Sequence, residues 1–556
     1  MTFTVKIHPG EMEIDAEEGH TLLDVVIRSG LFIESICSGR GLCGRCIVSV
    51  QSGASSPLEA EEKILGKEAT TAGLRLACVT KVATDMEISV PADTIRLAGV
   101  AELSPVPERT SFPLSSIEEG NYVFKVGESR VFLGRVPDPV CGVALDAGTT
   151  TIESLLVDMK DGSIKAESRE LNRQISIGTD IISRISYGIK SDGNREILRK
   201  ALFRSIEKSL SDLFRFAGVK RENVVALAIS GNVFIMHSLL GKSLTGLAKF
   251  PFSPPLTDTL LLSDSLPLPV HGSGCIILYP APGAFVGGDL VAGAISLSLD
   301  VEGTPAVFVD IGTNTEILIR KGDRWIVTSA PSGGAFEGAE MKCGKLAIPG
   351  AVTNCEYDTE IVLQVIGGGE PDGISGSGIV SLVCLLLSIK VMTPDGRILS
   401  PAEARGLVPP SVLWRLSEID GENAFLLYLP ERGGRPVYLG QGDVRNFQTA
   451  KGAIRAGLET ALAELDLAPE DVESVYVSGA FGRGVDEEAL IVTGIFPPGF
   501  RGKVIKAGNT ALSGAYLSLV MREAMMRAED FSGKVSVLHL GGNRLFSEKF
   551  IEHMNF

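Results

Sequence analysis

The chain has few of the features that mark secreted and membrane proteins. Its 556 residues hold nine cysteines, too few for a disulfide scaffold. Its longest apolar stretch, GIVSLVCLLLSIKVM from Gly378, meets Lys390 well short of the roughly 20 residues that a membrane-spanning helix needs. The opening residues, MTFTVKIHPGEMEID, alternate like a strand and lack the basic start and apolar run of a signal peptide. These absences predict a cytoplasmic protein with no membrane segment.

Positive charge is also scarce. The chain has 52 lysines and arginines against 68 aspartates and glutamates, a formal net charge of −16. Nucleic acids are bound largely by lysine and arginine side chains that neutralise phosphates, so a nucleic-acid partner is not expected. No convincing G-x-G-x-x-G unit follows a strand, and nothing indicates a flavin site. The length predicts three or four domains.

Four of the nine cysteines gather near the N-terminus. Cys37, Cys43 and Cys46 are spaced C-x5-C-x2-C within CSGRGLCGRC, and Cys78 follows in GLRLACVTKV. Four thiolates can bind a [2Fe-2S] cluster, and the plant-type spacing is close to this one. The intervening glycines let backbone N–H groups approach the sulfurs. A structural zinc site is the alternative, although its four cysteines usually form two short pairs and only one occurs here.

Hydrophobic periodicity around these cysteines predicts a small mixed domain. The expected elements are strands at Val5–His8, Met12–Asp15, Cys46–Val50 and Met86–Val90 and helices at Thr21–Ser29 and Glu61–Leu65. This order resembles that of a β-grasp ferredoxin over residues 1–93, and the four cysteines match the cluster ligands of that family. We therefore expect a [2Fe-2S] ferredoxin domain at 1–93.

Residues 94–139 have the composition of a linker. The stretch LSPVPERTSFPLSS mixes proline, serine and isolated charges. Strand-like sequence at Tyr122–Val126 and Val131–Leu133 predicts a hairpin packed on a neighbouring domain. The segment is too short for an independent domain of ordinary size.

A repeated motif opens the remaining part of the chain. The segment CGVALDAGTTTIESLLVD is a buried strand, a turn and a second strand, and AVFVDIGTNTEILIR has the same arrangement 164 residues later. Glycine lets backbone N–H groups approach phosphate oxygens, threonine hydroxyls add donors, and each aspartate can hold a hydrated Mg²⁺. The two turns predict a phosphate clamp made of Asp146, Gly148, Thr149 and Thr150 in one turn and Asp310, Gly312, Thr313 and Asn314 in the other.

Further motifs supply the companions of a nucleotide site. In VESVYVSGAFGRGVD a strand precedes a turn at Gly479, Ala480, Phe481 and Gly482, against which adenosine can lie. The segments ALAISGNVFIMHSLLG and GISGSGIVSLVCLLL are glycine-rich turns that lead into apolar helices. In this order the motifs resemble the actin, sugar-kinase and heat-shock-chaperone superfamily. That resemblance implies an α/β fold in which two ribonuclease-H-like lobes, here residues 140–556, close over ATP.

Four more phrases narrow the resemblance. GAFVGGDLVAGAI, GGAFEGAEMKCGKLAIPGA, QGDVRNFQTAKGAIRAG and GNTALSGAYL are similar to the ATPase domain of the reductive activators of corrinoid proteins, which also carry a ferredoxin domain. The resemblance implies an ATP-hydrolysing enzyme that passes an electron through its cluster to corrinoid Co(II) and restores Co(I). Members of that family have a further middle domain, and residues 94–139 are too short to contain one.

The same resemblance implies cofactors, roles and partners. The cofactors are the [2Fe-2S] cluster, ATP and Mg²⁺, with Asp146 and Asp310 holding the metal. Glu337 in GGAFEGAE and Asp289 in VGGDLVAG either orient the attacking water or metal or serve only at a turn. The expected partners are a corrinoid methyl-carrier protein and a low-potential electron donor, namely a ferredoxin, a flavodoxin or a reductase. A homodimer is a further candidate assembly.

Two other functions remain open on the sequence. The chain could be a ferredoxin-type electron carrier without ATP coupling, or an ATP-dependent small-molecule kinase or chaperone with a fused redox domain. A pure carrier would reduce its acceptor equally fast without ATP, whereas a kinase would phosphorylate an added metabolite.

Overall fold

The computed structural model places most of the chain. It describes residues 1–8, 12–29, 31, 33, 35, 39, 41, 44–91, 115–118, 121–126, 129–249, 252, 256–263, 266–268, 271, 274–312, 314–337, 341–430, 435–479 and 484–556. Six residues predicted to belong to sites lie outside the described residues: Cys37, Cys43, Thr313, Ala480, Phe481 and Gly482. Within the described part, no helix is both long and apolar enough to cross a membrane.

The N-terminal unit is the predicted β-grasp fold. Its five-stranded sheet has the order β2-β1-β5-β3-β4, with β1 and β5 parallel. Alternation along β1 buries Val5 and Ile7, and helix α1 packs Leu22, Val25 and Val26 into the same core. The elements are β1 (Thr2–His8), β2 (Met12–Glu17), α1 (Leu22–Ser29), β3 (Ile47–Ser52), α2 (Glu59–Leu65), α3 (Lys67–Thr71), β4 (Leu74–Leu76) and β5 (Met86–Ser89). The short elements α3 and β4 were not predicted.

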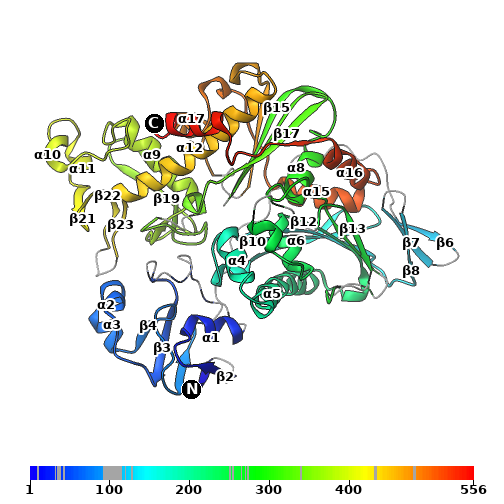
Figure 1. The fold of residues 1–556 in the computed structure, drawn as a ribbon, viewed down its shortest axis with the longest axis horizontal. Coiled ribbons are helices and arrows are strands. Elements are labelled where there is room, and N and C mark those ends of the chain that lie inside the picture. The colour runs from blue at the N-terminus through cyan, green and yellow to red at the C-terminus, as the bar shows by residue number, and fades with distance from the viewer. Residues whose placement is uncertain are drawn as a thin grey trace.

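The stretch predicted as a linker contains a three-stranded antiparallel sheet. Strands β6 (Ser115–Glu118), β7 (Asn121–Val126) and β8 (Ser129–Gly134) pair in that order, so the predicted hairpin is present as β7 and β8. Phe124, Val126 and Leu133 are buried in the core of the following domain. This sheet lies at the opposite end of the molecule from the ferredoxin unit (Figure 1).

Residues 141–302 form the first half of the two-lobed unit. Its six-stranded sheet has the order β11-β10-β9-β12-β14-β13. The first three strands are an antiparallel meander, β9 (Cys141–Ala147), β10 (Thr151–Asp158) and β11 (Ile164–Leu171). Strands β12 (Val224–Gly231) and β14 (Cys275–Leu278) continue it in parallel to β9, and β13 (Leu260–Ser263) ends it.

Residues 303–556 form a second half built on the same plan. The order is β25-β24-β15-β16-β17-β26, again with a three-stranded meander and parallel strands beside its first member. The strands are β15 (Gly303–Ile311), β16 (Thr315–Gly322), β17 (Arg324–Ala330), β24 (Ser474–Ser478), β25 (Val504–Lys506) and β26 (Ser536–Val537). The internal repeat predicted from the two turns is therefore a repeat of whole sheets.

Helices pack between and outside the two sheets (Figure 1). Helices α8 and α15 cross closely, because Gly514 leaves room for the backbone of Ala292; a Cβ at 514 would lie 2.2 Å from that carbonyl oxygen. Helix α5 covers the outer face of the first sheet and α12 that of the second. The first-half helices are η1 (Arg173–Ser176), α4 (Ile181–Gly188), α5 (Asp192–Ala217), η2 (Arg221–Asn223), α6 (Val233–Leu239), α7 (Thr245–Ala248) and α8 (Gly288–Ser296). The second-half helices are η3 (Ala335–Glu337), α9 (Gly376–Ser388), α10 (Pro401–Ala404), α11 (Pro410–Leu413), α12 (Gln441–Glu464), η4 (Pro469–Asp471), α14 (Glu487–Val492), η5 (Pro498–Phe500), α15 (Thr510–Val520), α16 (Ala524–Lys534) and α17 (Arg544–Glu552).

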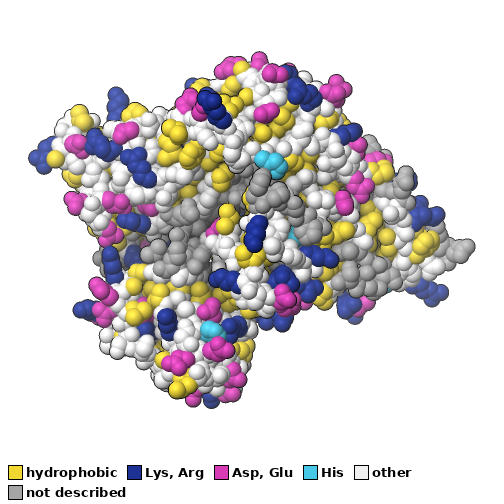
Figure 2. All heavy atoms as spheres, viewed as in Figure 1, with side chains coloured by type: hydrophobic (Ala, Val, Ile, Leu, Met, Phe, Trp, Pro, Cys, Tyr) yellow, Lys and Arg dark blue, Asp and Glu magenta, His cyan; other side chains and the backbone are white. Residues whose placement is uncertain are grey.

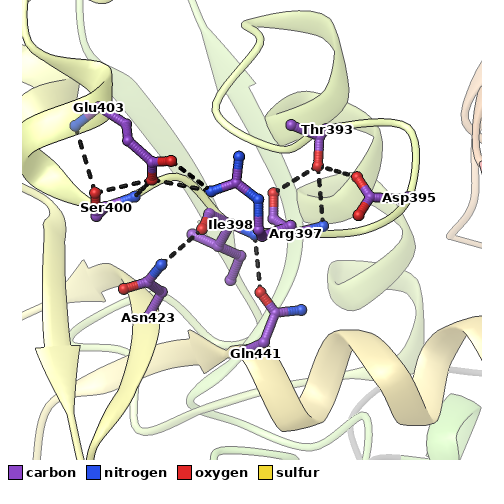
Figure 3. Close-up of polar contacts among 8 residues, drawn as sticks. All are labelled: Thr393, Asp395, Arg397, Ile398, Ser400, Glu403, Asn423 and Gln441. Atoms are coloured by element: carbon purple, nitrogen blue, oxygen red, sulfur yellow. Dashed lines mark hydrogen bonds and ion pairs between the residues drawn. The ribbon is translucent and has the colours of Figure 1, made fainter.

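The second half carries extra strands between β17 and α12. They form two small sheets, β19-β18-β20 and β21-β22-β23, made of β18 (Ala351–Tyr357), β19 (Ile361–Val365), β20 (Gly373–Ile374), β21 (Leu416–Ile419), β22 (Glu422–Tyr428) and β23 (Val437–Gly440). A polar network around the loop before α10 fastens this insertion (Figure 3). There Arg397 pairs with Glu403 at 2.8 Å, and Ile398 is held through its backbone by Asn423 and Gln441. The network ties the insertion to the start of α12.

The surface has no single electrostatic character on the face that Figure 2 displays. Acidic and basic side chains are interspersed there over both the ferredoxin unit and the two-lobed unit (Figure 2). Among the residues coloured in that view, no continuous basic stripe of the kind that follows a nucleic-acid backbone is seen.

Candidate functional site

A cleft between the two halves brings the repeated turns together. The turn between β9 and β10 and the turn between β15 and β16 both contribute to its lining. The predicted residues that line it are Asp146, Gly148, Thr149, Thr150, Asp310, Gly312, Asn314 and Gly479. Glu337 ends η3, and its side chain lies outside what the structure describes. Asp146 and Gly479, which are 333 positions apart in the chain, thus share one cavity.

Three hydrogen bonds hold the first turn, between β9 and β10, in place. Gly148 donates its backbone N–H to the carbonyl of Thr151 at 2.9 Å, and a Cβ at 148 would lie 2.8 Å from that oxygen, so glycine is required. The fully buried guanidinium of Arg184 donates to the carbonyl of Thr149 at 2.7 Å. Asn232 donates to the Thr149 hydroxyl at 3.1 Å. These hydrogen bonds hold the backbone of the turn in one conformation.

The second turn meets the predicted adenosine turn. Gly479 follows β24, which runs parallel to β15, and has a φ of +89°. A Cβ at 479 would lie 2.7 Å from Oδ1 of Asp310 and 2.8 Å from the carbonyl oxygen of Ile311. The backbone at Gly479 therefore lies directly against the second turn, and no larger residue fits there.

Several helices begin at the cleft. Asn232 caps α6, Ser375 caps α9 and Asn509 caps α15, each by accepting a backbone N–H of the first turn of its helix. All three residues line the cavity. Helix N-termini present unpaired N–H groups and a partial positive charge, so they favour phosphate. This arrangement suits a polyphosphate ligand.

Five carboxylates line the cleft beside the two turns. Asp146 lies directly across the strand pair from Glu153, and Asp310 lies across from Glu316. The side-chain amide of Asn509 donates to Asp146 at 3.0 Å and to Glu153 at 2.9 Å. Asp289, in the first turn of α8, completes the group.

Burial and mutual repulsion make these carboxylates hard to ionise. Burial, followed by the charge of Asp289, raises the pKa of Asp310 to about 7. Burial also raises the pKa of Asp289 to about 6. The pKa of Asp146 is raised well above its usual value by burial, and the charges of Glu153, Asp289 and Asp310 raise it further. Buried carboxylates that repel one another are stabilised by a hard divalent cation such as Mg²⁺. Among the described residues, however, no three such side chains lie close enough together to hold a metal ion by themselves, so protein carboxylates alone would not complete the coordination of Mg²⁺.

Sequence reasoning missed part of this site. Glu153 and Glu316 were not selected, although the repeat places each of them opposite its aspartate. Asp289 had two open interpretations and lines the cleft. Asn509 and Lys345 were also missed; the only sequence signals for them were the phrases GNTALSGAYL and KCGKLAIPGA, which suggest no particular role.

The described part of the cluster site is a tight loop beside two cysteines. Cys46 and Cys78 are buried, and the carbonyl of Cys46 accepts the N–H of Ala77 at 2.8 Å, which holds the two segments together. Gly39, Gly41 and Gly44 all have positive φ, from 67° to 81°. Such conformations let a loop wrap closely and aim N–H groups inward. The thiols of Cys46 and Cys78 fit a cluster whose other predicted ligands are Cys37 and Cys43.

The fold and the two sites define a class: an actin and sugar-kinase type ATPase fold joined to a [2Fe-2S] ferredoxin. Comparison with family models agrees with this class. Residues 5–83 match the 2Fe-2S iron-sulfur cluster binding domain, residues 141–302 the RACo middle region, and residues 304–556 the C-terminal ASKHA domain of RACo. The chain belongs to the RACo family.

Proteins that match most of the chain have names that refer to corrinoid proteins. The corrinoid activation enzyme RamQ of Eubacterium limosum is 26% identical in an alignment of length 554. The alignment covers 92% of this chain and 92% of RamQ. A reductase of Methanosarcina barkeri, named for the Co(II) methylated amine-specific corrinoid protein, is 23% identical over 432 residues, covering 72% of this chain and 73% of that one. A solved structure of a reductive activator for a corrinoid, iron-sulfur protein superposes with a TM-score of 0.73 at 25% identity, covering 100% of this chain and 98% of that one.

One expectation is corrected by these matches. The family's middle region corresponds to residues 141–302, so the chain does not lack it. Residues 141–302 begin with the first of the two repeated turns, which is why they were predicted to belong to the ATPase fold. The middle domain was expected before them, in residues 94–139. The middle region is the first of the two matching halves.

Proposed function

We propose that the chain is an ATP-dependent reductive activator of a corrinoid protein. One electron enters from a low-potential donor, passes through the ferredoxin unit, and reduces the substrate Co(II) to Co(I). The observation that carries this proposal is the fusion of a [2Fe-2S] domain to a phosphate cleft within one family, with contacts between the two parts. We assign the donor to the low-potential ferredoxins, flavodoxins or reductases, and the reaction to the cytoplasm.

The nucleotide is proposed to bind in the cleft between the halves. Backbone N–H groups of the turns at Gly148 and Gly312 hold phosphate oxygens, and the nucleoside lies against the backbone of the turn that begins at Gly479. Asp146 and Asp310 hold Mg²⁺, directly or through water. Their cross-strand partners, Glu153 and Glu316, lie next to them. Glu337 remains our candidate for orienting the attacking water.

ATP is needed because the electron transfer is uphill. Plant-type clusters have potentials near about −400 mV, and each ~59 mV of mismatch in a one-electron transfer costs about tenfold in the equilibrium. The ferredoxin unit supplies the electron, and the two-lobed unit changes which conformation of the complex is favoured. Coupling of ~1–3 kcal/mol between two sites shifts an affinity about 5- to 150-fold. We propose that lobe closure grips the corrinoid protein and alters the cobalt coordination, and that hydrolysis releases it.

The test separates the two halves of this function. Asp310→Ala should keep the iron content and lower ATP hydrolysis by orders of magnitude, because positioned metal charge is a large term in phosphoryl transfer. Cys43→Ser should keep nucleotide binding and damage the cluster. Neither variant should form Co(I), and the formation of Co(I) is measured by its visible absorbance. The wild-type ATPase rate should rise when the Co(II) partner is added, because linkage is reciprocal.

The decisive measurement is the rate at which Asp310→Ala forms Co(I) with the same electron donor as the wild type. If Asp310→Ala forms Co(I) at the wild-type rate with the same donor, ATP is not coupled to the transfer and the chain is a simple electron carrier. Asp192→Ala, at a side chain that is 92% exposed, is the matched control for loss of an aspartate. Sedimentation of the purified chain tests the homodimer.

A further inference from the structure

The ferredoxin unit contacts both halves of the two-lobed unit close to its cluster loop. On the first half, Ser176 of η1 donates its hydroxyl to the carbonyl oxygen of Ile33 at 2.5 Å. On the second half, Arg45 donates to the carbonyl of Asp372 at 3.4 Å, and its guanidinium lies 3.8 Å from the Asp372 carboxylate. Arg45 directly precedes the predicted ligand Cys46. The second half also reaches the ferredoxin unit through Arg435, which donates to the carbonyl oxygen of Ile64. Both halves therefore contact the ferredoxin unit near the cluster loop.

Asp372 is shared between this contact and the nucleotide cleft. Nζ of Lys345 lies 2.5 Å from one carboxylate oxygen of Asp372 and 2.6 Å from the other. Lys345 is only 6% exposed and lines the cleft. Among the described lining residues, the other cation is Arg169, which is already paired with Glu153 at 2.9 Å. Of these two cations, Lys345 is thus the one whose carboxylate partner, Asp372, also contacts the ferredoxin unit.

Backbone geometry fits the Lys345–Asp372 pair into its place. Gly350 has a φ of +89°, and a Cβ there would lie 2.4 Å from Oδ1 of Asp372. A Cβ at Gly373 would lie 2.6 Å from Cβ of Lys345. The backbone of Lys345 also donates to Ile374 at 2.8 Å. The backbone packs closely around the pair, in which the Lys345 side chain is buried and the Asp372 side chain is 53% exposed.

The segments that reach the ferredoxin unit also touch each other across the cleft. Ile175, next to Ser176, and Leu171 form a buried cluster with Leu346 and Ile348, which follow Lys345. This small apolar contact joins the first half to the second. The residues beside Ser176 and those beside Lys345 therefore pack against each other where the two halves meet.

We propose that Asp372 is a shared counter-ion that couples nucleotide in the cleft to docking of the ferredoxin unit. Phosphate oxygens compete with Asp372 for the ammonium of Lys345. When Lys345 turns to the phosphates, Arg45 becomes the cation that neutralises Asp372, and the ferredoxin unit docks more tightly. By linkage, the presence of Arg45 favours nucleotide binding to the same extent. The proposal rests on the nucleotide site proposed above.

The first test is a double-mutant cycle on the full, cluster-loaded chain. The probe is the magnesium complex of adenylyl imidodiphosphate, a non-hydrolysable ATP analogue, titrated by calorimetry. Arg45→Ala should weaken its binding roughly two- to fivefold, the range of a partly exposed ion pair. Asp372→Asn should tighten binding by a similar factor, because Lys345 no longer has to give up an ion pair with a carboxylate in order to contact the phosphates. In the Asp372→Asn background, Arg45→Ala should have no effect. Lys6→Ala, at an exposed ion pair on the same domain, is the control and should bind as wild type.

The second readout is hydrogen exchange of the peptide 44–52. The analogue should slow exchange there in the wild type and in Lys6→Ala, and should leave it unchanged in Asp372→Asn. Equal protection in Asp372→Asn, or an Arg45→Ala effect that persists in that background, overturns the shared counter-ion. A wild-type chain that does not bind the analogue at all refutes the nucleotide site itself, which is a different result.

Discussion

The backbone of Gly479 lies against the carboxylate of Asp310 and leaves no room for a side chain between the end of β24 and the turn that joins β15 to β16. This contact joins two predicted parts of the site that are 169 residues apart in the chain. It makes the geometry of Asp310 depend on a residue that carries no functional group.

Gly479→Ala should therefore weaken nucleotide binding without touching the cluster. The added Cβ, only 2.7 Å from Oδ1, must displace Asp310 or open the turn. We expect the affinity for a magnesium–nucleotide complex to fall by about tenfold or more, as overpacking of a tight site implies. Gly502→Ala is the control, since Gly502 also has a positive φ, +77°, but has no atom within 4 Å of its Cβ position. Equal losses in the two variants would assign the effect to backbone strain alone.

The buried carboxylates predict how stability depends on pH. Burial raises the pKa of Asp289 to about 6 and that of Asp310 to about 7, whereas an unfolded aspartate has a pKa of about 3.9. Between these values the folded chain binds more protons than the unfolded chain, so stability falls as the pH rises through this window. The melting temperature of nucleotide-free protein in EDTA should decrease between about pH 5 and about pH 7.

Asp310→Asn isolates the contribution of one group to this slope. The variant removes a titrating carboxyl, so its melting temperature should fall less over the same range. Asp192→Asn, at an exposed side chain, should reproduce the wild-type slope. A wild-type melting temperature that rises steadily over this range would contradict the raised pKa values.

The cluster ligands predict the metal content. Protein purified without oxygen should contain two irons and two sulfides, and reduction should give a spin-half [2Fe-2S] signal. Cys46→Ser and Cys78→Ser should each lower the iron content and change that signal, because both cysteines are buried and the N–H of Ala77, next to Cys78, donates to the carbonyl of Cys46. Zinc in place of iron after anaerobic preparation would support the structural-zinc alternative.

A buried ion pair predicts that the ferredoxin unit can be destabilised by itself. Arg75 donates to Glu61 at 2.6 and 3.0 Å, and both side chains are almost completely buried. Arg75→Met leaves the Glu61 carboxylate buried without its cation, which typically costs about 3–5 kcal/mol. Calorimetry should show an early transition that releases the cluster, while nucleotide binding to the remaining fold persists. Lys6→Met removes an exposed pair and should cost less than about 1 kcal/mol.

The fold was largely predictable because its signals are local. The strand alternation around Val5 and the cysteine spacing identify a ferredoxin from adjacent residues, and the repeat around Asp146 and Asp310 announces two matching halves. The register then makes Glu153 and Glu316 equivalent, so a stricter use of the repeat would have found both.

Contacts between loops were not predictable in the same way. Lys345 and Asp372 meet only because β20 returns beside the loop after η3, and Arg45 reaches them from a separate domain. Asn509 shows the same limitation. As a helix cap it has an ordinary local role, and its bridge from Asp146 to Glu153 exists only once two halves are assembled.

The matching strand order of the two sheets has a consequence for the ancestry of this site. Each half presents one glycine turn and one Asp–Glu pair to the same cavity, as two copies related by a pseudo-twofold axis would do. Such a pattern is what duplication and fusion of a self-associating single-lobe ancestor leaves behind. The strands inserted between β17 and α12 interrupt only the later copy, and that copy alone carries Asp372. The proposed coupling to the ferredoxin unit through Asp372 therefore depends on an element that only one of the two similar halves has.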